Sequence, residues 1–138
     1  MTRIIVACAF ALGLGAAACG STNNQVVASE AAAAPAFPAM SWDQVSAAVT
    51  EGAVLVDARS AGEYADGHIT GAISVPAHAD ETALAALPSD KATQLITYCG
   101  GPACGARSAV GRAAQKLGFT KIAEYQGGYP EWKKNQAM

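Results

Sequence analysis

The sequence predicts a small α/β domain built on a mostly parallel β-sheet. Segments with helical spacing alternate with short apolar runs of strand length over residues 41–133. The runs at 53–56 and 94–98 are nearly continuous in apolar residues, without the polar alternation of a half-exposed strand. Such strands, flanked by helices, favour a parallel sheet that is covered on both faces.

The first half of the domain carries clear start and stop signals. Ser41 is a suitable N-cap for a helix over 41–50, and Gly52 ends the turn before the apolar strand 53–56. Ser60 and Glu63 have the spacing of a capping box for a short helix over 61–66. A loop over 67–71 then leads to a short strand at 72–75, which Pro76 stops.

The second half repeats the alternation. In chain order, the sequence predicts a helix over 80–87, a strand over 94–98, a helix from 104 or 105 to 117, a strand over 122–125 and a helix over 129–133. The long helix carries a face of small and apolar residues that can pack closely on a sheet: Ala106, Ala109, Val110, Ala113, Ala114 and Leu117. Gly118 is expected to cap it, and Trp132 is expected to point inward.

Composition narrows the class of partner. The chain has 138 residues, a net charge of -2, 14% charged residues and 51% hydrophobic residues. Its nine basic residues form no patch, which argues against nucleic acid as a partner. No cofactor motif is present, so we expect none.

The N-terminus is expected to be an export signal. A basic start, an apolar run and small residues precede Cys19 and predict a signal peptide over 1–18. Small residues followed by cysteine resemble a bacterial lipobox, so Cys19 is a candidate lipidation site for a periplasmic, membrane-anchored protein. A plain cleaved signal and an uncleaved anchor are the alternatives. Residues 19–40 are rich in Ala and Pro and predict a tether ahead of a domain over 41–138.

Two cysteines remain in the domain, Cys99 and Cys104. They are too few for a disulfide scaffold, and a zinc site would need both His68 and His78 as further ligands. Neither histidine has helical ligand spacing, so we expect no metal. Cys99 follows a strand and precedes a glycine-rich loop and a helix, where backbone N–H groups stabilise a sulfur anion.

The residues at this sheet edge resemble a known family. Residues 54–59 and 63–76, Tyr98-Cys99 with its glycine-rich loop, and the segments 118–119 and 127–132 are similar to the signatures of the rhodanese-like domain, over about 41–134. The resemblance implies an open parallel sheet of about five strands with helices on both faces. It also implies a thiosulfate-type sulfurtransferase that passes sulfur to a thiol or cyanide-like acceptor.

Within this resemblance, Cys99 is the expected catalytic residue and carries sulfur as a persulfide. The expected substrate-binding residues supply the loop backbone: Gly100, Gly101, Ala103, Cys104 and Gly105. Structural support is expected from three residues outside the loop: Asp57 and Arg59 as an ion pair at the strand end, and His68 as a hydrogen-bonding loop residue.

The loop departs from the common family pattern at Cys104, where an arginine is usual, and Arg107-Ser108 comes three positions later. Efficient use of thiosulfate and phosphatase activity are both disfavoured by that loss. Cys104 is either a small apolar residue at a helix start or a resolving thiol for Cys99. A thiol–disulfide switch and a non-catalytic binding module therefore stay open as alternative functions.

Overall fold

The computed structural model describes residues 36–136, so the expected signal, Cys19 and most of the tether lie outside the described residues. The strands are β1 (Ala39–Met40), β2 (Val54–Asp57), β3 (Ile73–Ser74), β4 (Leu95–Tyr98) and β5 (Ile122–Tyr125). The helices are α1 (Trp42–Thr50), α2 (Ala61–Asp66), α3 (Glu81–Leu84), α4 (Ala106–Lys116) and α5 (Gly128–Gln136).

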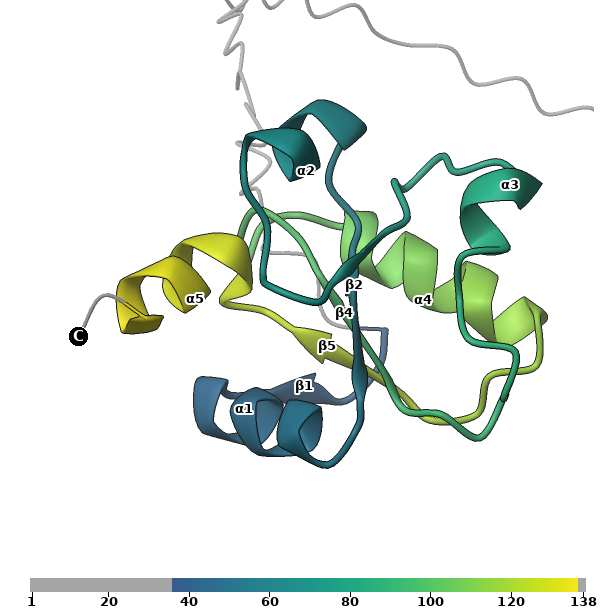
Figure 1. Ribbon diagram of the computed structural model, residues 1–138, viewed down its shortest axis with the longest axis horizontal. Coiled ribbons are helices and arrows are strands. Elements are labelled where there is room, and N and C mark those ends of the chain that lie inside the picture. Colours follow the sequence, from purple (N-terminus) through teal and green to yellow (C-terminus); the bar gives the residue numbers. More distant parts are fainter. Residues whose placement is uncertain (1–35, 137–138) are drawn as a thin grey trace, which may run out of the picture.

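The five strands form one sheet in the order β1-β5-β4-β2-β3, and every neighbouring pair is parallel. Helices lie on both sides of this sheet, with α1 and α5 on one side and α4 on the other (Figure 1). The expected open α/β fold is therefore confirmed. No helix among residues 36–136 is long and apolar enough to cross a membrane.

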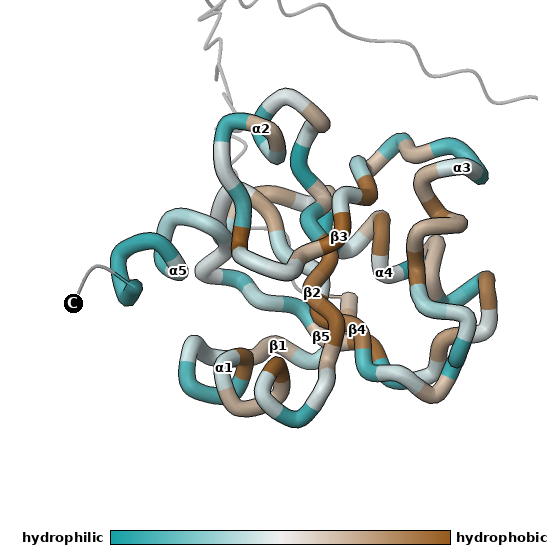
Figure 2. The backbone as a smooth tube through the Cα atoms, viewed as in Figure 1, coloured by the Kyte–Doolittle hydropathy of each residue, from teal (hydrophilic) through white to brown (hydrophobic). Residues whose placement is uncertain are grey.

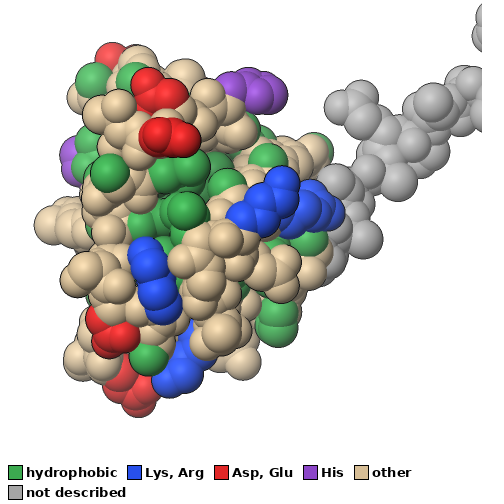
Figure 3. All heavy atoms as spheres, turned by 90° about the vertical axis from the view of Figure 1, so that its right-hand side faces the viewer, with side chains coloured by type: hydrophobic (Ala, Val, Ile, Leu, Met, Phe, Trp, Pro, Cys, Tyr) green, Lys and Arg blue, Asp and Glu red, His purple; other side chains and the backbone are tan. Residues whose placement is uncertain are grey.

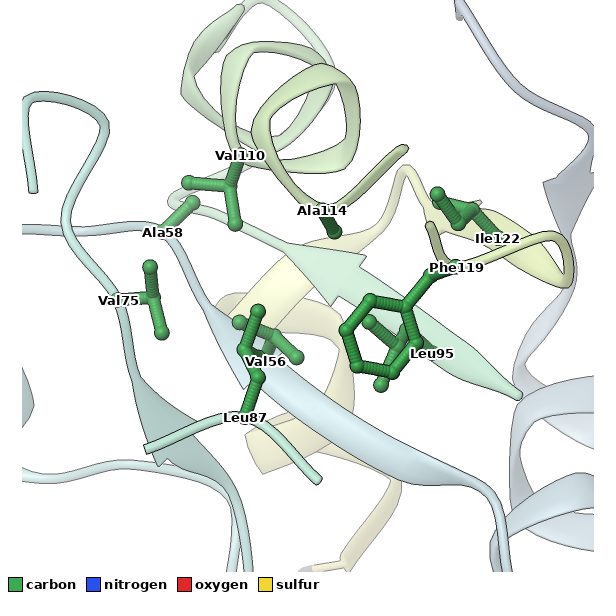
Figure 4. Packing of buried hydrophobic residues seen from close by; sticks show 9 residues of the cluster. All are labelled: Val56, Ala58, Val75, Leu87, Leu95, Val110, Ala114, Phe119 and Ile122. Carbon is green, nitrogen blue, oxygen red and sulfur yellow. The ribbon is translucent and has the colours of Figure 1, made fainter. Parts of the chain in front are cut away.

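Alternation along the central strands builds a core on each face of the sheet. In β4, Leu95 packs into the cluster under α4, whereas its neighbour Ile96 packs into the cluster under α1. Figure 2 shows the most apolar backbone along the middle of the sheet, and Figure 4 shows Val110 and Ala114 of α4 facing the strands. Because both faces are covered, β2, β4 and β5 are buried at nearly every position, as expected for strands of such a sheet.

Local capping explains where the first two helices begin. Ser41 accepts a hydrogen bond from the Gln44 N–H, and the Gln44 side chain accepts one from the Ser41 N–H. Ser60 and Glu63 form the same reciprocal box at the start of α2, as their spacing predicted. Each box satisfies N–H groups that the first helical turn leaves free.

Several boundaries differ from those expected. Ala39 and Met40, assigned to the tether, form β1 and pair with Glu124 and Tyr125. The helix expected over 80–87 is confined to Glu81–Leu84, since Asp80 caps it and only one turn follows. The last helix is longer than expected and begins at Gly128.

The expected buried face of α4 is confirmed only in part: Val110 and Ala114 are buried, but other positions differ. Ala109 is exposed and the Leu117 side chain is 44% exposed, whereas Arg107, Ser108 and Gly111 are buried. Leu117 is the C-cap and Gly118 follows it with φ +95°, a conformation that favours glycine. Arg107 is buried because it pairs with the Glu124 carboxylate of β5.

Candidate active site

The three central strands end in register at one edge of the sheet. Asp57 of β2 is paired with Tyr98 of β4, and Tyr98 is paired with Tyr125 of β5. The chain therefore leaves the sheet side by side at Ala58, Cys99 and Gln126. This edge is the carboxyl end of a parallel sheet, where ligands of such folds bind.

Cys99 and Cys104 are joined by a disulfide bond, with their Cα atoms 6.2 Å apart. That separation lies within the usual range for a disulfide. Cys104 precedes α4 rather than starting it, because the N-cap is Gly105. The Cys104 N–H donates to the Gly101 carbonyl at 3.2 Å, which turns the loop back toward Cys99.

Arg107 holds this loop from beneath. Its guanidinium donates hydrogen bonds to the carbonyls of Gly101, Pro102 and Cys104. Its Nε lies 2.9 Å from a carboxylate oxygen of Glu124 in β5, and both side chains are fully buried. Arg107 therefore acts as a clamp that ties the loop to the sheet, and it does not face a substrate.

Glu124 is satisfied on both oxygens. Oε2 accepts from Arg107, while Oε1 accepts from the Ser108 hydroxyl at 2.7 Å and from the Ala36 N–H at 3.0 Å. Both oxygens of this buried carboxylate therefore have hydrogen-bond partners, as buried polar groups require. The Arg107–Glu124–Ser108 network thus fixes the start of α4 above β5.

The turn into α5 contacts the other side of the loop. The Tyr129 N–H donates to the Cys99 carbonyl at 3.0 Å, and Gly128 has φ +62°. A Cβ atom at Gly128 would lie 2.2 Å from the Cys99 carbonyl oxygen. Only glycine allows this approach, so the Gly127-Gly128 motif positions the backbone of Cys99.

Asp57 and Arg59 form a buried ion pair at the end of β2, with 2.6 Å between Arg59 Nη2 and Asp57 Oδ2. The Tyr98 hydroxyl donates to the same carboxylate at 2.7 Å, and Arg59 also donates to the Gly67 carbonyl. The Tyr129 ring lies against the guanidinium, 4.4 Å from centroid to carbon. Hydrogen bonding to Asp57 holds the pKa of Arg59 above its ordinary value.

A hollow of about 390 Å³ opens beside the cysteines. Its wall includes Cys99, Cys104 and Ala106 from the loop and helix, and Arg59 and His78 from the loops after β2 and β3. The side chains of this wall are mostly small or apolar. The charge of Arg59 is already paired with Asp57. A ligand that enters this hollow lies next to both cysteine residues.

The loop backbone includes N–H groups that have no acceptor among the described residues. Within residues 36–136, no carbonyl or side chain accepts a hydrogen bond from the N–H groups of Gly100, Gly101 and Ala103. Gly105 precedes α4 without a side-chain cap, which leaves the first N–H groups of that helix free as well. Convergent N–H groups of this kind favour a bound anion.

His68 lies away from the cysteines. Its Nδ1 is 2.9 Å from the Tyr64 carbonyl and its ring stacks on Tyr64, with 3.7 Å between the centroids. His68 is exposed and is not part of the wall of the hollow. Among the described residues, no group of three or more His, Cys, Asp or Glu side chains is arranged to hold a metal ion.

Comparison with known proteins identifies the family. The model of the rhodanese-like domain matches residues 41–135, which is most of the chain. The chain belongs to the rhodanese-like family. That match begins at the helix Ser41 caps and runs through α5, so it includes both cysteines and both segments that hold their loop.

Individual relatives agree with this family. The chain is 33% identical to thiosulfate sulfurtransferase GlpE of Pseudomonas entomophila over 99 residues, which cover 70% of this chain and 85% of that protein. A protein from Bacillus halodurans matches with a TM-score of 0.63 and 31% identity, covering 72% of this chain and 74% of that one. The human single-domain sulfurtransferase TSTD1 matches with a TM-score of 0.55 and 27% identity, covering 70% and 96%.

Sequence reasoning did not anticipate the clamp beneath this rhodanese-like loop. It treated Arg107 as displaced from the site and gave Glu124 no role. One signal was available: Glu124 lies in the middle of an otherwise uncharged strand that is buried at every position. A charged residue in such a place needs a partner, and the nearest unassigned cation in the active-site segment is Arg107.

Proposed function

We propose that the protein is a sulfurtransferase in which Cys99 carries sulfane sulfur as a persulfide. The observation that supports this proposal is the position of Cys99 at the carboxyl edge of the sheet, beside a hollow and at the start of a loop with unused N–H groups. Family membership supports the reaction class, and the thiosulfate sulfurtransferase relative supports the kind of donor.

In this proposal the Cys99 thiolate attacks the outer sulfur of the donor. The bond between that sulfur and the rest of the donor breaks, and the leaving group departs with the electron pair. N–H groups of Gly100, Gly101 and Ala103 stabilise the persulfide anion, as backbone amides do at other anion sites. An acceptor thiol or cyanide then removes the outer sulfur.

The hollow offers little free positive charge to bind an anionic sulfur donor. Arg59 is its nearest cation, and this side chain is engaged by Asp57 and Gly67. Glu63 also lies in the wall, and hydrogen bonds from Ser60 hold its pKa below the ordinary value, so it is ionised at neutral pH. We therefore expect weak binding of thiosulfate and a high KM for it.

The test is direct loading of the full chain with sulfur. Cys104→Ala protein, reduced with a dithiol and freed of reductant, should gain the mass of one sulfur atom on the Cys99 peptide after thiosulfate treatment. The Cys99→Ala variant should not gain this mass, because Cys99 is the attacking group. Reduced Cys104→Ala protein that stays unmodified would refute the proposal.

The Cys99–Cys104 disulfide favours one further candidate, a thiol–disulfide switch without sulfur transfer. In that case the two thiols oxidise and reduce together, and Cys99 accepts no sulfur in either state. The loading experiment separates the two functions, since a pure redox protein gains no sulfur after reduction.

A further inference from the structure

We propose that Cys104 is a second catalytic residue, which resolves the Cys99 persulfide and releases its sulfur as hydrogen sulfide. This inference rests on the proposed sulfurtransferase function and names the acceptor in it. It starts from one observation: the Sγ atom bonded to Cys99 is that of Cys104, five residues along the same loop. The inner sulfur of a persulfide on Cys99 is therefore within reach of a thiolate at Cys104.

The reaction balances without an outside oxidant. The Cys104 thiolate attacks Cys99 Sγ, so that the Cys99–Cys104 bond forms and the bond from Cys99 Sγ to the outer sulfur breaks. The outer sulfur leaves with the electron pair and takes one proton from solvent, so that it departs as hydrosulfide. It is reduced by two electrons while the two cysteines are oxidised to a disulfide, and the Cys104 proton has already passed to solvent.

The loop favours this attack because its backbone is held on two sides. Arg107 binds the carbonyls of Gly101, Pro102 and Cys104, which keeps Cys104 beside Cys99. The Tyr129 N–H holds the Cys99 carbonyl from the opposite side. A nucleophile held in place has a high effective concentration, so it competes well with a free thiol in solution.

The surroundings of Cys104 suit a thiolate. Cys104 lies two positions before Ala106, where α4 begins without a side-chain cap. The amino end of a helix favours negative charge, and no carboxylate of α4 lies in its first turn. Cys104 is also partly exposed and lines the hollow, so the released hydrosulfide has a way out.

Each cycle leaves the protein as the Cys99–Cys104 disulfide, the form described above. A dithiol reductant must then reduce it before Cys99 accepts sulfur again. The complete reaction converts one sulfane sulfur and one dithiol into hydrogen sulfide and a disulfide. The partner implied is thus a dithiol, small or carried by a protein, and not a final sulfur-accepting thiol.

The test is a single turnover of reduced, reductant-free full-length protein with thiosulfate. Wild type should release about one sulfide per chain and end as a disulfide, because the resolving thiol acts once. Cys104→Ala should keep the extra sulfur on Cys99 and release no more sulfide than Cys99→Ala. A Cys8→Ala/Cys19→Ala variant is the matched control and should behave as wild type.

Two outcomes of this experiment would overturn different proposals. If Cys104→Ala gains no sulfur, the proposed sulfurtransferase function fails and this inference fails with it. If Cys104→Ala gains sulfur and wild type also keeps it, with no sulfide and free Cys104, the sulfurtransferase stands and the resolving role is wrong. Thiocyanate formed on later addition of cyanide should fall with time in wild type and stay constant in Cys104→Ala.

Discussion

At the scale of single residues, a buried charge determines the shape of the cysteine loop. Arg107 and Glu124 are fully enclosed, and each would be costly alone in an apolar interior. As a pair, their opposite charges compensate each other. The remaining N–H donors of Arg107 bind three loop carbonyls. The loop can therefore turn sharply at the edge of the sheet without leaving those carbonyls unpaired.

Replacing Glu124 with Gln should destabilise the protein strongly, since it leaves the Arg107 charge buried without a counter-charge. Removal of one partner of a buried pair costs about 3–5 kcal/mol in the free energy of unfolding. Urea unfolding measures this change. Arg112→Gln, on the exposed side of the same helix, is the matched control and should change stability by less than about 0.5 kcal/mol. A loss below about 1 kcal/mol for Glu124→Gln would show that the pair is dispensable.

At the scale of elements, the start of α5 supports the site as much as the loop itself does. Gly128 brings the chain against the Cys99 carbonyl, and Tyr129 hydrogen-bonds it. The turn after β5 thereby fixes the backbone that follows β4. Two segments nearly thirty positions apart in sequence hold one cysteine.

Gly128→Ala should destabilise the protein more than Gly52→Ala does. Both glycines have positive φ, at +62° and +97°, so both variants carry the strain of a left-handed residue, about 1–2 kcal/mol. Only Gly128 also meets backbone atoms, whereas nothing lies within 4 Å of a Cβ at Gly52. Urea unfolding of the two variants isolates the steric part.

We expect that part to be about 1–3 kcal/mol, the usual cost of overpacking. Equal losses for the two variants would mean that the turn moves away from Cys99 without cost. In that event the turn would not position the loop.

At the scale of the whole molecule, buried tyrosines on the α1 and α5 side of the sheet link stability to alkaline pH. Tyr98 and Tyr125 are fully buried, and burial raises the pKa of each above the ordinary value of 10.0. Above pH 10 the unfolded chain loses these protons while the folded protein keeps them. The contribution of these tyrosines to the free energy of unfolding is therefore fully present below pH 10. It falls as the pH rises above that value.

The Tyr125→Phe variant tests this relation. The Tyr125 hydroxyl has no hydrogen-bond partner within the described residues, so its removal should cost nothing at pH 8. Between pH 10 and 11 the variant should lose on the order of 1 kcal/mol less stability than wild type. The reason is that its unfolded chain no longer has the Tyr125 proton to lose. Urea midpoints of the oxidised protein over this range give the comparison, and parallel curves would contradict it.

An apolar region lies on the surface outside the site. Figure 3 shows hydrophobic side chains gathered between charged ones on the face that includes α3. There Leu84, Leu87 and Leu117 line a second hollow, of about 420 Å³, and Lys91 forms part of its wall.

The expected export signal and lipid anchor at Cys19 lie outside the described residues and stay predictions.

The sequence by itself determined the fold class, the order of most elements and the edge at which Cys99 lies. These features depend on local signals, namely apolar runs, capping residues and glycines, which act within a few positions of each other. The family resemblance rested on the same short segments, and it was confirmed.

Only the tertiary structure decided what surrounds Cys99. The Arg107–Glu124 pair joins residues 17 positions apart, and the Gly128 contact joins the loop to a segment beyond β5. The short β1 lacks the length of a recognisable strand and exists because β5 offers it an edge. Such contacts depend on how the strands align across the sheet, which spacing along one chain does not specify. The Cys99–Cys104 bond depends on the tertiary structure in the same way, because the turn of the loop brings its two sulfur atoms together.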